Sequence, residues 1–250
     1  MREDEFYQDF RSEVAKEVAI VLGKVTHFLH KDIVDYISEK NIDFEKEFNN
    51  FSTVPNSFNN NDFFGDDCVF PGYRRVVNGE RKDKWKNNLS KDGTILNDNT
   101  IPRHIWAFLT IGKCYSGPNW KESKLNKFEL AHIFNHKVDE IDFERKYFKN
   151  INDKIKPYSL FSSASNVVLI PKGLAKPTDN LDEVKLCFYN KFIDYYKKTP
   201  KGINGFRKDK LPLWYDDVKW NEPKLPKDWK KNIDKLLVYR SENLKKRYNK

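Results

Sequence analysis

The chain has 250 residues, a formal net charge of +9 and 15% aromatic residues. This length suits one large domain or two small ones, and the excess of positive charge favours a polyanionic partner such as nucleic acid over a plain solvated surface. The three cysteines lie far apart and form no CxxC pair, which argues against a disulfide framework and a cysteine zinc site. No apolar run approaches the ~20 residues that a membrane helix needs, and the first residues are too acidic and polar for a signal peptide. We therefore expect a cytoplasmic protein without a membrane partner.

Two helices are predicted near the N-terminus. Apolar residues recur there at spacings of three and four, which is typical of a helical stripe, at Phe10, Val14, Val18, Val21 and Val25. A second helix is predicted over residues 31–40, with an inward face made of Ile33, Val34 and Ile37. Residues 49–66 are rich in Asn and Ser and contain a Pro and a Gly, which predicts a long loop.

A basic hairpin is predicted over residues 71–88. Asn78-Gly79 follows a β-branched pair, a combination that favours a tight hairpin turn. The hairpin would present basic side chains beside Tyr73 and Trp85, namely Arg74, Arg75, Arg81, Lys82, Lys84 and Lys86. Basic residues that alternate with aromatic ones suit phosphate contacts and base stacking, although a solvated hairpin has the same composition.

Three further segments complete the outline of the chain outside its central region. Residues 102–112 are predicted to be a buried helix or strand, and residues 116–127 a polar loop around Trp120. A closing helix is predicted over residues 226–248, with a basic face that either touches DNA or is solvated.

The central region combines a histidine strand, an asparagine strand and a helix. The short apolar segment FELAHIF carries His132, and about thirty polar residues later the strand SNVVLIP opens with Asn166. Asn180 followed by Glu183 is a helix-start signature. The helix after it has an apolar face made of Leu181, Val184, Phe188, Phe192 and Tyr195.

These residue types suit phosphodiester cleavage, which needs a base to activate water and a cation to stabilise the developing charge. His132 is the candidate base, and the Asn166 amide is expected to bond across the loop and hold that histidine. About 70 residues of the chain resemble the ββα-metal (HNH) nuclease family. The resemblance rests on His132-Ile133 and on the strand that Asn166 opens. The segment SNVVLIPKGLAKPTDN is similar to the second half of the nuclease domain in restriction enzymes.

Two positions depart from the family pattern. The resemblance implies a metal ligand at residue 175, usually His or Asn, and often an Asp at residue 131, but both positions are Ala. Three explanations stay open for Ala175: an engineered knockout, a natural variant that uses Asp179 or His136 as a ligand, or a decayed domain. Lys172 and Lys176 flank the expected metal loop, where they either bind phosphate or are solvated.

The resemblance implies an α+β fold, with a ββα-metal motif embedded in a largely helical protein. We expect residues 1–100 to form a helical region with the basic hairpin for DNA recognition, residues 101–200 the nuclease region, and residues 201–250 a basic arm and helix. The implied activity is Mg²⁺-dependent hydrolysis of double-stranded DNA. The mass outside the nuclease region suggests a sequence-specific restriction endonuclease, and a palindromic site would require a homodimer. The alternative is a non-catalytic nucleic-acid-binding protein that retains the same scaffold.

Overall fold

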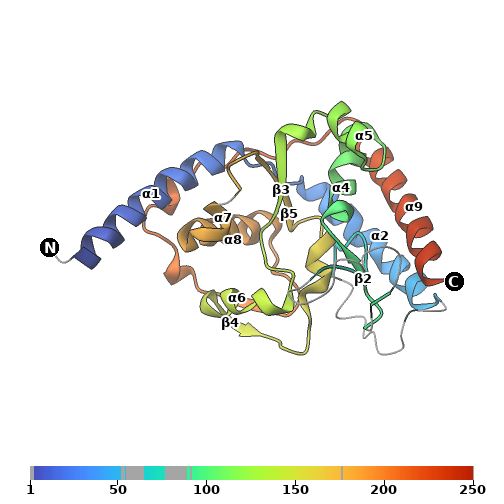
Figure 1. The fold of residues 1–250 in the computed structure, drawn as a ribbon, viewed down its shortest axis with the longest axis horizontal. Coiled ribbons are helices and arrows are strands. Elements are labelled where there is room, and N and C mark those ends of the chain that lie inside the picture. Colours follow the sequence, from blue (N-terminus) through green and yellow to red (C-terminus); the bar gives the residue numbers. More distant parts are fainter. Residues whose placement is uncertain are drawn as a thin grey trace.

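The computed structural model describes residues 3–51, 54, 65–76, 89, 90, 92–175 and 177–249, which adopt an α+β fold in which helices surround small sheets (Figure 1). The main helices of these residues are α1 (Glu3–Val25), α2 (Lys31–Asn49), α4 (Thr100–Ile111), α5 (Gly117–Glu122), α6 (Asp142–Tyr147), α7 (Pro177–Asn180), α8 (Asp182–Tyr196) and α9 (Trp229–Tyr248). The strands pair two by two: β1 (Tyr73–Arg75) with β2 (Ile95–Asn97), β3 (Phe128–His132) with β5 (Val167–Pro171), and β4 (Phe148–Ile151) with β6 (Ile203–Phe206).

The β3–β5 pair lies at the centre of the fold and confirms the two strands predicted there. The strands are antiparallel, with Ala131 opposite Val168 and His132 opposite Val167. The first four residues of β5 are buried on both faces, as expected of a continuous apolar run. The far edge of β5 pairs with the chain at His27, whose N–H donates to the carbonyl of Leu169 over 2.9 Å.

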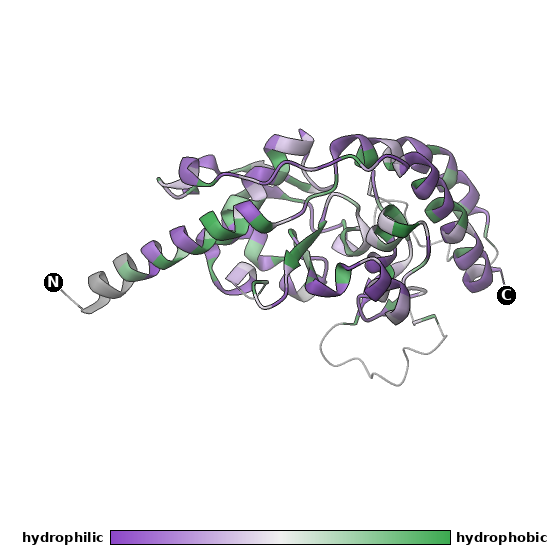
Figure 2. Ribbon diagram, turned by 90° about the horizontal axis from the view of Figure 1, so that it is seen from above, coloured by the Kyte–Doolittle hydropathy of each residue, from purple (hydrophilic) through white to green (hydrophobic). Residues whose placement is uncertain are grey.

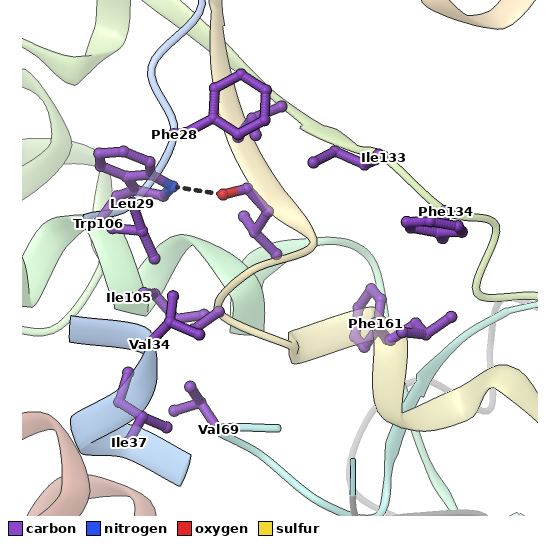
Figure 3. Close-up of a cluster of buried hydrophobic side chains, with 14 of the residues drawn as sticks. Phe28, Leu29, Val34, Ile37, Val69, Ile105, Trp106, Ile133, Phe134 and Phe161 are labelled. Carbon is purple, nitrogen blue, oxygen red and sulfur yellow. Dashed lines mark hydrogen bonds between the residues drawn. The ribbon is translucent and has the colours of Figure 1, made fainter. Parts of the chain in front are cut away.

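Helices cover this pair on both sides. The face that carries Ala131 and Val168 borders Phe188 of α8. Towards the other side lies α4, where the Trp106 indole N–H donates to the carbonyl of Val167 over 3.4 Å (Figure 3). The same cluster holds Val34 of α2 and Phe161. The predicted segment 102–112 is therefore a buried helix, and it ends at Gly112, whose φ of 64° is in the left-handed region that favours glycine.

Most of the predicted stripe of α1 lies outside the packed face, although Val18 packs against the core. The helix is present, but Phe10, Val14 and Val21 are exposed. The buried hydrophobic residues include Ala15, Ala19 and Leu22, and the small volume of the two alanines allows close packing. Residues 218 and 219 lie so close to α1 that a Cβ added to Gly23 would be 2.8 Å from the side chain of Val218 and 3.0 Å from the carbonyl oxygen of Lys219. The volume of the side chains, and not their hydrophobicity alone, therefore determines which face of α1 packs against the core.

Two segments predicted as loops contain regular structure. Residues 116–127 form α5 and a short 3-10 helix, because Ser116 accepts a hydrogen bond from the N–H of Asn119 and Trp120 is buried. The interval between β3 and β5 holds α6, β4 and the 3-10 helix η4 (Pro157–Ser162). Asn180 does not cap α8, because it ends the short α7 and the residue before α8 is Leu181.

The other predicted elements agree with the structure in part: α2 continues nine residues beyond its predicted end to Asn49, and most of the predicted loop 49–66 lies outside the described residues. α2 begins at Lys31 and buries the predicted Ile33, Val34 and Ile37, and α9 lies within the predicted closing helix. The turn of the basic hairpin lies outside the described residues, and the strand before it pairs in parallel with β2.

One hydrophobic cluster joins all three segments of the chain. It includes Ile33 from residues 1–100, Phe134 from residues 101–200 and Leu236 from residues 201–250. Figure 2 shows hydrophobic residues towards the middle of the molecule, whereas α9 near the C-terminus is largely hydrophilic on the outside. Among the described residues, no helix is both long and apolar enough to cross a membrane.

Candidate functional site

Asn166 holds the chain segment that follows His132. Its side chain is fully buried just before β5. The Oδ1 atom accepts a hydrogen bond from the N–H of Phe134 over 2.7 Å, and Nδ2 donates to the carbonyls of Phe134 (3.1 Å) and Leu160 (2.9 Å). Both amide hydrogens and the oxygen are thus satisfied. The hydrogen bond predicted across the loop is present, and it fixes the backbone two residues beyond His132.

Asp67 in turn fixes the approach to Asn166. This buried carboxylate accepts hydrogen bonds from Ser163 Oγ (2.8 Å) and the N–H of Ser165 (2.5 Å), and it forms an ion pair with Lys198 over 3.2 Å. Burial alone would raise the pKa of Asp67, but the Lys198 charge and these hydrogen bonds hold it below its ordinary value. The residues that enter β5 are therefore anchored from the opposite side of the fold.

The His132 ring has a defined tautomer. Its Nε2 lies 3.0 Å from the carbonyl oxygen of Phe161. A carbonyl oxygen only accepts hydrogen bonds, so Nε2 carries the hydrogen and Nδ1 keeps its lone pair. Burial lowers the pKa of His132 to about 4, and the charges of Arg75 and Lys137 lower it too, against the opposing effect of the Phe161 carbonyl. At neutral pH this ring is consequently an uncharged proton acceptor.

A second histidine lies against the first. The ring centroids of His132 and His136 are 4.2 Å apart. His136 is buried, and its Nδ1 has no hydrogen-bond partner among the described residues. Burial is the main cause that lowers the pKa of His136 well below its ordinary value. The site therefore contains two neutral imidazoles in contact.

Both rings border an open cavity of about 790 Å³ that carries charges of both signs. Its cationic side chains come from four different parts of the chain, and they are Arg75, Arg103, Lys137 and Lys185. Its carboxylates are Glu129, Glu140 and Asp179. Lys137 is paired with Glu140, and Arg103 donates to the hydroxyl of Tyr115 over 2.8 Å. The cavity can thus receive an anionic ligand next to a neutral base.

A buried carboxylate supports the segment from the other side. Glu144 is fully buried. It accepts hydrogen bonds from the N–H of Asn135 (2.9 Å), from Nδ2 of Asn135 (3.1 Å) and from the hydroxyl of Tyr189 (2.8 Å). The Oδ1 atom of Asn135 accepts a hydrogen bond from Nζ of Lys185 over 3.2 Å. Residues 134 and 135 are therefore fixed by Asn166 and Glu144 respectively.

The sequence does not predict the hydrogen bonds by which Glu144 holds Asn135. Glu144 and Asn135 carry no local signal, because their partners lie far away in the sequence. Lys185 does carry a local sequence signal. It follows Leu181 by four residues and precedes Phe188 by three, which places a lysine within the apolar face of α8.

The predicted metal loop reaches the same cavity, which Ala131, Ala175 and Asp179 all line. The two positions where the resemblance implies ligands therefore present methyl groups. Among the described side chains, no three or more His, Cys, Asp or Glu form a group that could hold a metal ion. His136 and Asp179 belong to no such group. Mg²⁺ prefers oxygen ligands in octahedral geometry, and the described donor set does not fit this ion.

The predicted DNA contacts are placed in different environments. Arg74 is buried: its Nε donates to Thr94 Oγ1 over 2.8 Å and lies 3.4 Å from Asp92, so the prediction that it contacts DNA is corrected. Its neighbour Arg75 lines the cavity, and Lys172 lies on an exposed turn after β5. The remaining candidates lie outside the described residues, and they are Arg81, Lys82, Lys84 and Lys176.

Comparisons of the chain with protein-family models, with curated proteins and with solved structures each return no match.

Proposed function

We propose that this chain is a nuclease that hydrolyses phosphodiester bonds in DNA, with His132 as the general base. The observation that carries the proposal is the hydrogen bond from His132 Nε2 to the carbonyl of Phe161, which leaves Nδ1 as a neutral acceptor in a ring that borders a cavity with four cationic and three acidic side chains. The order of β3, β5 and α8, with His132 and Asn166 at adjacent strand ends, supports the resemblance to HNH nucleases.

In the proposed reaction, Nδ1 of His132 removes a proton from a water molecule while the water oxygen attacks phosphorus. The ring is anchored by the Phe161 carbonyl, so the lone pair keeps its direction. An anionic phosphodiester next to Arg75 would offset the positive charge that lowers the pKa of His132. Substrate binding is therefore expected to raise that pKa towards neutrality, where a general base works best.

Asn166 and Glu144 are proposed as positioning residues. Neither is offered as a contact to the substrate, because both are buried and fully engaged with the backbone or side chains of residues 134 and 135. Their role is to hold the segment that joins His132 to His136. Catalytic groups require such support because small displacements cost large factors in rate.

The charge of the whole chain is consistent with a nucleic-acid substrate. A net charge of +9 attracts a polyanion over long range. The strand-strand-helix unit is a minor part of the 250 residues, so we propose that the remainder recognises a DNA sequence, as in a restriction endonuclease that acts as a homodimer on a palindromic site.

The test is incubation of the purified chain, and of a His132→Ala variant, with genomic DNA samples of different base composition. Each reaction is run with Mg²⁺ and with EDTA, and products are separated by size. The proposal expects fragments from the parent chain and far fewer from the variant over the same time. Discrete bands would identify a sequence-specific enzyme and a smear a nonspecific one. Binding without cleavage in every sample would instead establish the non-catalytic alternative.

A further inference from the structure

The Lys185 ammonium occupies an unusual position. It projects from the first turn of α8 to the cavity that His132 lines, and its Nζ donates to Asn135 Oδ1 over 3.2 Å. Nζ also lies 4.3 Å from the ring centroid of Phe143. Burial lowers the pKa of Lys185, while surrounding carboxylates, with Glu144 the strongest, raise it in part. A charged group at such a site must gain from an interaction that offsets its loss of hydration.

No carboxylate within 4 Å supplies that interaction among the described residues. The groups in contact with Nζ are an amide oxygen and an aromatic face, both uncharged. Lys137 at the same cavity is in contrast paired with Glu140. The charge of Glu144 raises the pKa of Lys185 without direct contact. Glu144 also binds Nδ2 of Asn135, whose Oδ1 accepts the hydrogen bond from the ammonium. The positive charge at Lys185 is therefore held in place and remains available to an anion.

The ammonium also lies near Ala131 and Ala175, the two positions where the resemblance implies metal ligands. A small cavity between β3 and α8 is lined by the polar side chains of His132, Thr178 and Lys185 and by apolar residues, namely Ala131, Ile133, Val168, Ile170 and Phe188. Ala175 lines the larger cavity next to it. A divalent cation in the small cavity would face a fixed positive charge and apolar side chains, whereas the carboxylates Glu129, Glu140 and Asp179 line the larger cavity. The same surroundings suit an anionic oxygen, because hydrolysis of a phosphodiester requires positive charge near the non-bridging and leaving oxygens.

We propose that Lys185 binds the scissile phosphate, and that this chain hydrolyses phosphodiesters without a divalent cation. The inference rests on the proposed nuclease function. A bond forms between the water oxygen and phosphorus, and the water proton passes to Nδ1 of His132. The bond between phosphorus and the leaving oxygen breaks, and that oxygen takes a proton from the Lys185 ammonium. The proton on His132 returns to Lys185 through solvent, so the products are an alcohol and a phosphate monoester.

The experiment compares DNA cleavage by the parent chain, Lys185→Met, Lys185→Arg and Lys191→Met in excess EDTA and in Mg²⁺. Lys191 lies on the same helix above Tyr195, outside the cavity lining, and serves as the matched control. Circular dichroism and a thermal melt check that each variant folds, and fluorescence anisotropy measures its DNA binding.

The proposal expects parent and Lys191→Met to cleave equally with EDTA and with Mg²⁺. Lys185→Met should lose activity by about 100-fold or more, as expected when one transition-state contact is removed, and Lys185→Arg should keep part of it. Folded Lys185→Met with parental activity would overturn the proposal. Parental cleavage that EDTA abolishes and Mg²⁺ restores would also overturn it, while leaving the nuclease function intact. Absence of cleavage under both conditions would overturn the nuclease function itself.

Discussion

Asn166 and Phe134 exchange two hydrogen bonds, with the N–H of Phe134 donating to Oδ1 over 2.7 Å and Nδ2 donating to the carbonyl of Phe134 over 3.1 Å. The side chain thereby extends the β3–β5 pairing beyond the N-terminal end of β5. The arrangement sets the path of residues 133–136, and with it the positions of both histidines.

Replacement of this amide tests its structural role. Asn166→Asp keeps the acceptor for Phe134 but places a carboxylate oxygen against the carbonyls of Phe134 and Leu160. We expect a loss of about 3 kcal/mol in the free energy of unfolding, because a buried charge is left with repelling neighbours. Urea denaturation measures the loss, and Asn180→Asp, at an exposed position, is the control. Equal stability of the two variants would contradict the proposed role.

The activity should persist to an unusually low pH. The base must be uncharged to accept a proton, and burial lowers the pKa of His132 to about 4 in the free chain. We therefore expect kcat/KM to stay constant on acidification from pH 7 and to reach half its value only near pH 4. The acid limb of kcat should lie higher, because a bound phosphate anion raises the pKa. An acid limb of kcat/KM near pH 6.5 would show that the ring is solvated.

Glu144 should affect both stability and rate. In Glu144→Gln the new amide group faces Nδ2 of Asn135, so two donors oppose each other unless the Asn135 amide rotates away from Lys185. We expect a loss of about 1–3 kcal/mol in the free energy of unfolding, together with a lower cleavage rate. Glu122→Gln removes an exposed carboxylate that pairs with Lys113 and provides the control. A normal rate in a destabilised Glu144→Gln chain would restrict this residue to folding.

Ala175 offers a separate test of how the site obtains its positive charge. If Lys185 supplies that charge, Ala175→Asn should cleave at the parental rate in EDTA, and Mg²⁺ should not increase it. A rate that rises with Mg²⁺ only in the Ala175→Asn chain would instead indicate a metal site whose ligand has been lost. Titration of Mg²⁺ against the initial cleavage rate distinguishes the two results.

The parts of the site that the sequence predicts correctly are those encoded by short local patterns. β3 and β5 follow from compact apolar runs, and the Asn166 bond follows from a polar residue at the opening of a buried strand. The support from Glu144 could not be predicted, because its partners Asn135 and Tyr189 lie on separate elements that meet only after folding.

Two errors have related causes. The stripe that includes Phe10 was predicted to be the core face of α1, but the helix packs through the face that carries Ala15 and Ala19, and residues 218 and 219 approach it closely at Gly23. Arg74 looked like a surface cation, but the parallel pairing of β1 with β2 places it beside Asp92. In both cases a long-range contact overrode the local pattern.

The central claim is that His132 is the base of a nuclease. The most direct measurement is the initial rate of DNA cleavage by the parent chain and by His132→Ala, at concentrations where both bind the substrate equally, with His27→Ala as the control. We expect His132→Ala to be slower by about 10²–10⁴-fold, the usual contribution of a general base, and His27→Ala to cleave at the parental rate. Equal rates for the parent and His132→Ala would contradict it.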